Sequence, residues 1–323
     1  MKHILSALLA ACLLTVGGCS EQHFTEPPSD KPLTILSHAK EPTLTFLDEN
    51  WQVAVTANSR AVLTDMIRTG DRQLIATSQE ETSLFLFDLA EGKSRPLLEL
   101  NEGLTALAFS AEDEQLYVSD IINDQVHIID YHKNEQLGSI DVGEAPTDLH
   151  LASDGTLYVL NERSHTVTVI DSATAEVLRT FSVMERPVGL LEDGRQLWIG
   201  GHGPFGELNN RIIAYDKETG QPLQEITVGL MPVAFFKQPD TSYLYVLCHG
   251  DHSLYKIDTT ENEVVDRLEV GHNPNGMAGN RSTIVVTSLD SDTVSVIDLA
   301  TFSLIHEEPV APGPYTIVLE ESE

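Results

Sequence analysis

The stretch that decides the fold reads Pro146-Thr-Asp-Leu-His-Leu, a turn at Ser153-Asp-Gly155, Leu157-Tyr-Val-Leu-Asn161, a loop, Thr166-Val-Thr-Val-Ile-Asp171 and Val177-Leu-Arg-Thr-Phe-Ser-Val183. Each of its four runs alternates apolar with polar residues and is rich in β-branched and aromatic side chains, which is typical of a strand. Four short strands joined by tight turns make one blade of a β-propeller. The stretch therefore predicts one such blade.

An aspartate closes the third run of this unit, and it recurs along the chain at intervals of 40 to 45 residues. The seven copies are Asp48, Asp88, Asp130, Asp171, Asp216, Asp258 and Asp298. Intervals in this range are typical of propeller blades. Each copy enters a tight turn whose backbone N–H groups its carboxylate can accept, so we assign all seven a structural role. The count predicts an all-β, seven-bladed β-propeller, and no helix is expected.

Aligning the other units on their aspartates recovers the same strands. The second strand appears as Leu116-Tyr-Val-Ser-Asp120 and Leu244-Tyr-Val-Leu-Cys248, and the third as Val294-Ser-Val-Ile-Asp298. With these motifs the chain resembles the YVTN family of β-propellers over about residues 33 to 319, strongly in repeats three to seven and weakly in the first two. The resemblance implies a propeller of four-stranded blades.

The two ends of the chain predict how the ring closes. Before Asp48 there are only the runs Leu33-Thr-Ile-Leu36 and Leu44-Thr-Phe-Leu47, followed by Trp51-Gln-Val-Ala-Val55. The missing innermost strand is available only as Tyr315-Thr-Ile-Val-Leu319. We predict that this C-terminal strand joins the N-terminal blade and leaves no open sheet edge at the seam. Because no linker interrupts the repeat, residues 33–323 are predicted to form one propeller domain.

Residues 1–18 predict a lipoprotein signal peptide. Lys2 precedes the apolar stretch Ile4 to Val16, which is too short for a stable membrane span and has the shape of a secretory h-region. Val16-Gly-Gly-Cys19 resembles the bacterial lipobox, which implies cleavage before Cys19 and acylation with chains such as palmitate; a plain signal peptide with an incidental cysteine is the alternative. Residues 19–32, polar and proline-rich, are expected to form an extended lipidated tether. The expected location is extracytoplasmic, on the cell membrane or the outer membrane.

The composition is strongly acidic. Lys and Arg number 19 and Asp and Glu 50, which gives a formal net charge of −31 at pH 7. Such a surface repels phosphate backbones, so nucleic acid is not expected as a partner. The charge serves either solubility, a salty environment or a cationic partner.

Once Cys12 leaves with the signal and Cys19 carries lipid, only Cys248 remains, so no intramolecular disulfide is possible and Cys248 is expected to be buried.

Departures from the repeat indicate a candidate ligand or metal site. The links between blades and the loops between second and third strands share one face, where propeller function usually gathers. There His202 and His249 occupy matching positions in adjacent blades, Asp251 follows in the same loop, and His272 lies in the next link. The fifth blade carries five extra residues within Gly203 to Asn210. Imidazoles and carboxylates that converge from neighbouring loops can bind a transition metal or act as acid and base; solvated loop histidines are the alternative.

Two functional hypotheses follow. The sequence contains no nucleophile elbow, phosphate loop, dinucleotide fingerprint, Cys-x-x-Cys or haem-attachment motif. The first hypothesis is a monomeric, membrane-anchored lipoprotein whose propeller acts as a binding scaffold for a protein, a glycan or a small ligand. The second is a propeller enzyme similar to streptogramin lyases or seven-bladed lactonases, with a His and acid site at the channel mouth and a divalent metal as a possible cofactor. Regular repeats with short loops favour the first.

Overall fold

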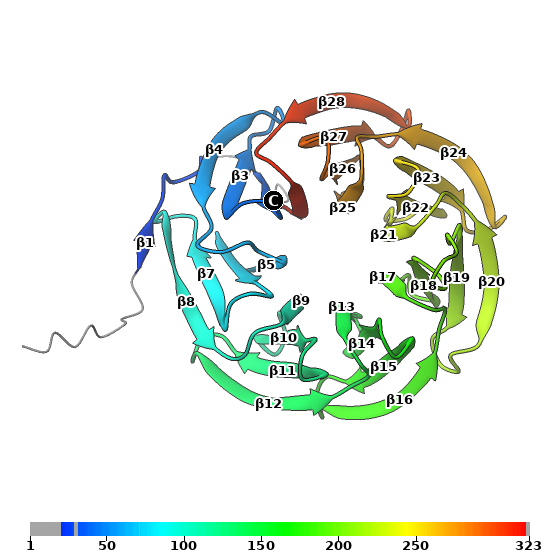
Figure 1. Ribbon diagram of the computed structural model, residues 1–323, viewed down its shortest axis with the longest axis horizontal. Coiled ribbons are helices and arrows are strands. Elements are labelled where there is room, and N and C mark those ends of the chain that lie inside the picture. Colours follow the sequence, from blue (N-terminus) through cyan, green and yellow to red (C-terminus); the bar gives the residue numbers. More distant parts are fainter. Residues whose placement is uncertain (1–20, 29–31, 71, 321–323) are drawn as a thin grey trace, which may run out of the picture.

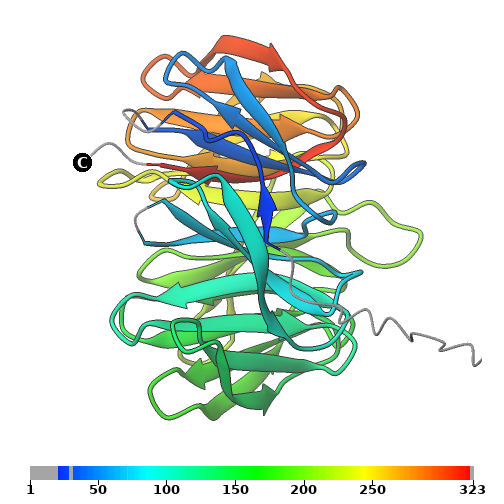
Figure 2. The ribbon, with the colours of Figure 1, turned by 90° about the vertical axis from the view of Figure 1, so that its left-hand side faces the viewer.

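The structure is a seven-bladed β-propeller. It is a computed structural model that describes residues 21–28, 32–70 and 72–320. Its regular elements within these ranges are all strands, and seven antiparallel sheets stand radially around a central axis (Figure 1). Figure 2 shows the resulting disc from the side. The predicted fold class is confirmed.

Each blade contains four strands that follow one another from the axis to the rim. The innermost strands are β29 (Pro314–Leu319), β5 (Asp65–Gly70), β9 (Leu104–Ser110), β13 (Pro146–Leu151), β17 (Pro187–Glu192), β21 (Pro232–Lys237) and β25 (Pro274–Gly279). The second strands are β2 (Thr34–His38), β6 (Gln73–Thr77), β10 (Gln115–Asp120), β14 (Thr156–Asn161), β18 (Gln196–Gly201), β22 (Tyr243–Cys248) and β26 (Thr283–Ser288). The third strands are β3 (Thr43–Leu47), β7 (Ser83–Asp88), β11 (Gln125–Asp130), β15 (Thr166–Asp171), β19 (Arg211–Asp216), β23 (Ser253–Asp258) and β27 (Thr293–Asp298). The outermost strands are β4 (Val53–Asn58), β8 (Lys93–Glu99), β12 (Glu135–Asp141), β16 (Glu176–Ser182), β20 (Pro222–Thr227), β24 (Glu263–Glu269) and β28 (Ser303–Pro309).

The hydrophobic core lies between the blades. Because successive side chains of a strand point to opposite faces of its sheet, a fully apolar strand can serve both neighbouring interfaces. In β14, Leu157 and Val159 pack against blade three, whereas Tyr158 and Leu160 pack against blade five. The same division produces one apolar cluster at each of the seven interfaces. This explains why the second strands are apolar at nearly every position.

The C-terminal strand closes the ring as predicted. β29 pairs antiparallel with β2, with Val318 opposite Ile35 and Leu319 opposite Thr34. Its side chains divide between two interfaces: Val318 packs toward blade two, and Ile317 and Leu319 pack toward blade seven. One sheet therefore contains both ends of the propeller domain: its innermost strand is C-terminal, and its other three strands come from the N-terminal part of the chain.

Part of the N-terminal segment that is expected to form the tether lies against the ring. Gln22–His23 forms β1, which pairs with the outer edge of β8 and makes blade two five-stranded. The segment is extended, as its composition predicts, but residues 21–28 are bound to the ring because backbone groups, an aromatic ring and an arginine hold them there. Residues 1–20 and 29–31, with the expected signal peptide and Cys19, lie outside the described residues. In the described part of the chain, no helix is long and apolar enough to cross a membrane.

Candidate functional site

The two histidines singled out in the sequence follow the second strands of blades five and six. His202 comes directly after β18 and His249 directly after β22. The backbone N–H of His202 donates to the carbonyl of Arg186 at 3.0 Å, and that of His249 donates to the carbonyl of Met231 at 3.1 Å. Glu162 in blade four makes the same bond to its own link at 2.9 Å. The three residues therefore occupy equivalent positions at the mouth of the channel.

The imidazoles of His202 and His249 lie against each other. Their ring centroids are 5.1 Å apart and their planes are inclined by 24°. Burial lowers the pKa of both side chains below 6.5; for His202, the nearby His249 and Arg186 lower it further. A hydrogen bond with the Asn275 side chain opposes this lowering at His249. Both rings are therefore neutral near pH 7 and can accept a proton or a hydrogen bond.

The links between blades place two further side chains beside these rings. Arg186 and Met231 both have a left-handed backbone, with φ of 47° and 55°. The guanidinium Nη2 of Arg186 lies 3.5 Å from Nδ1 of His202, and Sδ of Met231 lies 3.1 Å from Nε2 of His249. A non-glycine residue in this conformation costs about 1–2 kcal/mol, which the surrounding structure must offset. Because other links share the conformation, only the side chains distinguish blades five and six.

The structure does not assemble the full predicted set. The ring of His272 pairs instead with that of His252, with centroids 4.7 Å apart. The carboxylate of Asp251 is directed into its own blade, where it accepts the Tyr255 hydroxyl at 2.6 Å and lies 3.7 Å from Nη2 of Arg267. Within residues 21–28, 32–70 and 72–320, no group of three or more His, Cys, Asp or Glu side chains is arranged to hold a metal ion.

Two aspartates that the sequence reasoning missed line the channel. Asp65 lies at the start of β5, and Asp148 lies in β13 just after a β-bulge, a feature that redirects side chains next to binding sites. One carboxylate oxygen of Asp65 accepts the backbone N–H of Leu107 in the next blade at 2.8 Å, and Asp148 accepts that of Leu190 in the same way at 2.8 Å. Each carboxylate is thus fixed by the neighbouring blade.

These two carboxylates protonate more readily than ordinary ones. Burial raises the pKa of Asp65 to about 6, against the opposing effect of its backbone hydrogen bonds. Burial also raises the pKa of Asp148 to about 7, and the charge of Asp65 adds to the effect. Carboxyl groups whose pKa values are raised to near neutral pH are common in binding and catalytic sites.

A signal for these aspartates was present in the sequence. Both occupy the third position of an innermost run, counted from the residue that follows the link. The equivalent residues in the other blades are small or uncharged: Ala106, Gly189, Ala234, Gly276 and Thr316. Comparing innermost strands position by position would therefore have marked Asp65 and Asp148 as departures from the repeat.

The histidines and the aspartates line one cavity of about 450 Å³. Innermost strands of all seven blades contribute to its wall, so it is the mouth of the central channel. Its acidic and histidine lining residues are Asp65, Asp148, Glu162, His202 and His249, and its lining includes no lysine or arginine. The volume is within the usual range for a small-molecule site. Three carboxyl groups and no basic side chain in its lining give the cavity an acidic character.

The insertion in blade five forms the outer wall of a neighbouring hollow. Asn209 is buried, and its side-chain amide donates to the carbonyls of Gly201 and Arg211 at 2.9 and 2.8 Å. Phe205 is 94 % exposed at the tip of the insertion and borders a cavity of about 440 Å³ that Arg186 also lines. The insertion is therefore a braced loop with one free aromatic ring.

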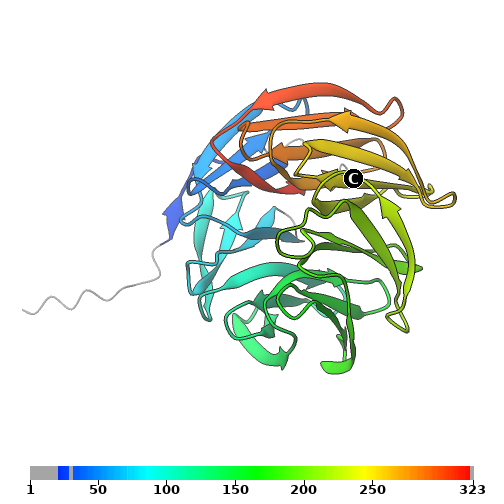
Figure 3. The same cartoon turned by 45° about the vertical axis from the view of Figure 1, so that its right-hand side comes forward.

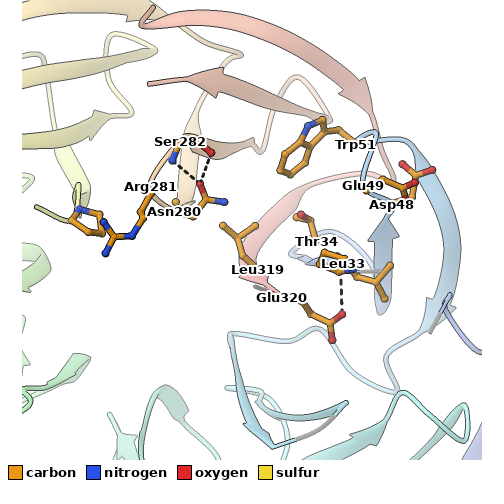
Figure 4. A pocket seen from close by; sticks show the side chains of 13 residues that line it. Leu33, Thr34, Asp48, Glu49, Trp51, Asn280, Arg281, Ser282, Leu319 and Glu320 are labelled. Atoms are coloured by element: carbon orange, nitrogen blue, oxygen red, sulfur yellow. Dashed lines mark hydrogen bonds between the residues drawn. The ribbon is translucent and has the colours of Figure 1, made fainter. Parts of the chain in front are cut away.

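A larger cavity, of about 680 Å³, lies on the opposite face between blades seven and one (Figure 4). Trp51, Arg281 and Glu320 are among its lining residues, and it contains no histidine. Asn280 accepts the N–H of Ser282 at 2.9 Å, which shapes one wall. The sequence indicated a site on the link face only and gave no sign of this cavity, since its wall is built from turns of different blades.

The other residues singled out in the sequence, the turn aspartates and Cys248, lie where a structural role is expected. All seven turn aspartates accept at least one backbone N–H of the turn that follows, at 2.7 to 3.0 Å. Cys248 is a fully buried free cysteine in the core between blades five and six, and burial raises the pKa of its thiol. Inside blade three, Nε2 of His127 lies 3.2 Å from Oδ2 of Asp120, and both side chains are closed off from solvent.

Fold and site together define a seven-bladed propeller with a polar, acidic channel mouth. No family model matches the chain, and no curated protein matches it either. Among solved structures, hydrazine synthase from Kuenenia stuttgartiensis is similar with a TM-score of 0.68 and 17 % identity, covering 80 % of this chain and 95 % of that one. Apo AztD from Citrobacter koseri is similar with a TM-score of 0.62 and 14 % identity, covering 90 % and 98 %.

A third similar structure is dihydro-heme d1 dehydrogenase NirN in complex with DHE, with a TM-score of 0.65 and 15 % identity, covering 91 % of this chain and 76 % of that one. At these identities the likeness establishes the propeller fold alone. One fold of this kind carries both enzymes and binding proteins, so the function of the chain has to be argued from its own side chains.

Proposed function

We propose that this protein is an extracytoplasmic lipoprotein of the YVTN type, anchored to a membrane through Cys19, whose propeller binds a small ligand at the mouth of its channel. The anchor is supported by the sequence pattern of the first 19 residues, which combines an h-region with a lipobox-like ending. The propeller fold supports a scaffold role, because a closed ring of blades presents its loops rigidly around one axis.

The acidic channel mouth carries the ligand-binding part of the proposal. Its cavity of about 450 Å³ is lined by Asp65 and Asp148, and no lysine or arginine is among its lining residues. Both carboxylates are already held by a backbone N–H of the next blade, so binding requires little reorganisation. A small organic cation, such as a protonated amine, complements these fixed acceptors.

Binding is favoured over catalysis by the directions in which the side chains point. His202 and His249 stack on each other, and Asp251, the acid expected to assist them, is directed into its own blade. The alternative, a lyase-like or lactonase-like enzyme, would use the same neutral imidazoles as proton acceptors. Turnover of a lactone or ester that is lost in His202→Gln would favour that alternative.

The binding proposal is tested with a diamine, putrescine, and full-length protein in mild detergent. Affinity should rise between pH 5 and pH 8, because Asp65 and Asp148 ionise over this interval with pKa values of about 6 and about 7. In the double variant Asp65→Asn/Asp148→Asn we expect a loss of at least about tenfold, or about 1.4 kcal/mol. Asp141→Asn, at an exposed carboxylate of β12, is the control. Equal calorimetric affinities in all three proteins would contradict the proposal.

The anchor is tested separately. Cys19→Ser should abolish labelling by radioactive palmitate and leave the protein as an uncleaved precursor or as a soluble export product, because the stretch before Cys19 is too short to span a bilayer stably. A Cys19→Ser band of mature size that still fractionates with membranes would contradict lipid anchoring and leave the channel proposal untouched.

A further inference from the structure

The N-terminal arm, residues 21–28, is docked along the rim of blade two. β1 extends the sheet beyond β8, with Gln22 opposite Ser94 and His23 opposite Lys93. The next residue, Phe24, donates its backbone N–H to the carbonyl of Gly92 at 2.8 Å. Figures 1 and 3 both show β1 on the outside of the ring, beyond the outermost strands.

Side chains also hold the arm against the ring. The ring of Phe24 stacks on that of Phe46 with a centroid distance of 6.3 Å and lies 6.4 Å from that of Phe87, so it completes the core between blades one and two. Arg72 donates to the backbone carbonyls of Pro27 and Pro28 at 3.1 and 3.0 Å. The arm is thus fixed at both of its ends.

The turn under the arm is shaped to receive it. Gly92 has φ of 60°, and a Cβ at this position would lie 2.5 Å from the backbone oxygen of Phe24. The left-handed backbone alone does not require glycine there, because the equivalent turns of other blades adopt it with Asn134, Ala175, Asn262 and Phe302. What distinguishes blade two is the close approach of the arm, and only glycine leaves room for it.

This docking fixes the place where a lipid at Cys19 would meet the ring. Cys19 precedes β1 by three residues, and three extended residues span at most about 10 Å. The rim of blade two would therefore be held within about 10 Å of the acyl chains. A tether that reached the ring only at residue 33 would instead leave fourteen residues of slack and allow the ring to turn freely.

Charge favours the same side of the ring. β8 carries Lys93 and Arg95 against Glu99, a net charge of +1, whereas the fourth strands of the other six blades have a net charge of zero or below. Nζ of Lys93 lies 2.8 Å from the carboxylate of Glu91 and 3.7 Å from that of Glu21 in the arm. β20 and β24, which lie across the ring in Figure 1, have net charges of −1 and −2. In a protein with a net charge of −31, the strand β8 is therefore repelled less by anionic headgroups than the outermost strands across the ring.

We propose that the rim of blade two is the membrane-facing surface of this protein, and that the docked arm holds the ring edge-on to the bilayer with the channel axis roughly parallel to the membrane plane. The inference rests on the lipid anchor proposed above. It assigns a role to the arm that a flexible spacer would not have. Both ends of the channel then open sideways into the aqueous compartment, so neither is covered by lipid.

The test uses lipidated full-length protein in liposomes that contain anionic lipid and a lipid with a nitroxide headgroup. A bimane label is attached at Glu99→Cys on β8 or at Val265→Cys on β24, both exposed positions. Cys248 is fully buried and does not compete for the label. We expect quenching at position 99 to exceed that at position 265 several-fold. Equal quenching at the two positions would overturn the proposal.

Releasing the arm provides the control. Gly92→Ala should expel the arm and remove the difference in quenching, while Asn262→Ala, in the equivalent turn of blade six, should leave it unchanged. Phe24→Ala should act like Gly92→Ala. Hydrogen exchange at the Phe24 amide reports docking independently. A protein that carries no lipid would not sediment with liposomes in any variant and would overturn the anchor, whereas a lipidated protein with equal quenching overturns only the orientation.

Discussion

Blade one borders two interfaces of different strength. Its interface with blade two contains thirteen buried apolar side chains, including Phe46 and Phe87, and Phe24 of the arm packs on top of them. Its interface with blade seven contains five among the described residues, including Val294 and Val296. Both interfaces belong to the blade that joins the two ends of the chain. We call the interface between blades one and two the thick interface and the one between blades seven and one the thin interface.

Polar contacts supplement the thin side. Nζ of Lys40 donates to the carbonyl of Leu289 at 2.6 Å and to the carboxylate of Asp292 at 3.2 Å, which joins the loops of blades one and seven. Thr287 donates its hydroxyl to the carbonyl of Tyr315 at 2.6 Å. Such contacts stabilise less than apolar burial does, since their groups exchange water for protein partners. We therefore expect the ring to open first between blades seven and one.

The largest effect should come from removing the closing strand. Deleting residues 312–323 exposes the inner edge of β2 and takes Ile317 and Leu319 out of the thin interface and Val318 out of the thick one. The loss should be comparable with the whole stability of a domain, about 5 kcal/mol or more, and should lead to aggregation through the open edge. Thermal unfolding and size-exclusion chromatography measure it. A deletion variant that melts with the parental protein would show that β29 does not close the ring.

A smaller effect distinguishes the two kinds of interface with one chemical change. Val294→Ala removes two methyl groups from the thin interface, and Val167→Ala removes the same groups from the equivalent position of blade four. Both side chains are fully buried, so each change should cost about 1–3 kcal/mol. Because the thin interface has fewer apolar groups left, Val294→Ala should accelerate hydrogen exchange in β2 and β29 more than Val167→Ala does in β18 and β17. Equal acceleration would remove the distinction between the interfaces.

The fold was predictable because it repeats. Seven copies of one strand pattern fixed the number of blades, and the lack of an innermost strand before Leu33 indicated closure by Tyr315 to Leu319. The docking of the arm was not predictable. It depends on one ring, Phe24, reaching a pocket between blades and on one glycine, Gly92, leaving space, and neither has a local sequence pattern.

The candidate site was predictable only in part, for a similar reason. The repeat alignment placed His202 and His249 in matching positions, and the blades bring their rings together. It could not give the direction of a side chain within a loop, and Asp251 is directed toward the Tyr255 hydroxyl instead of the channel. Asp148 was overlooked because it belongs to the strand pattern itself; the bulge before it directs its carboxylate toward the next blade.

The smallest effect tests the polar contacts of the thin interface. Lys40→Met should cost less than about 1 kcal/mol at low salt and almost nothing in 1 M NaCl, because an exposed ion pair is weak and screened. Lys133→Met is the matched control: it removes the same charge from an exposed pair with Asp130 that lies within one turn and crosses no interface. Both variants change the net charge of the protein by the same amount. The difference between their losses of stability therefore measures the contact between blades one and seven.

The same contact should depend on pH in a defined direction. A backbone hydrogen bond from Gly313, followed by the contact with Lys40, lowers the pKa of Asp292 below 3.8. A lowered carboxyl pKa stabilises the fold above about pH 4, and that contribution disappears as the pH falls through the folded-state value. The loss of melting temperature in Lys40→Met relative to the parental protein should therefore be present at pH 7 and shrink below pH 4. A difference that persisted in strong acid or in 1 M NaCl would mean that Lys40 acts through the packing of its methylene chain, and the thin interface would then owe less to charge than its contacts indicate.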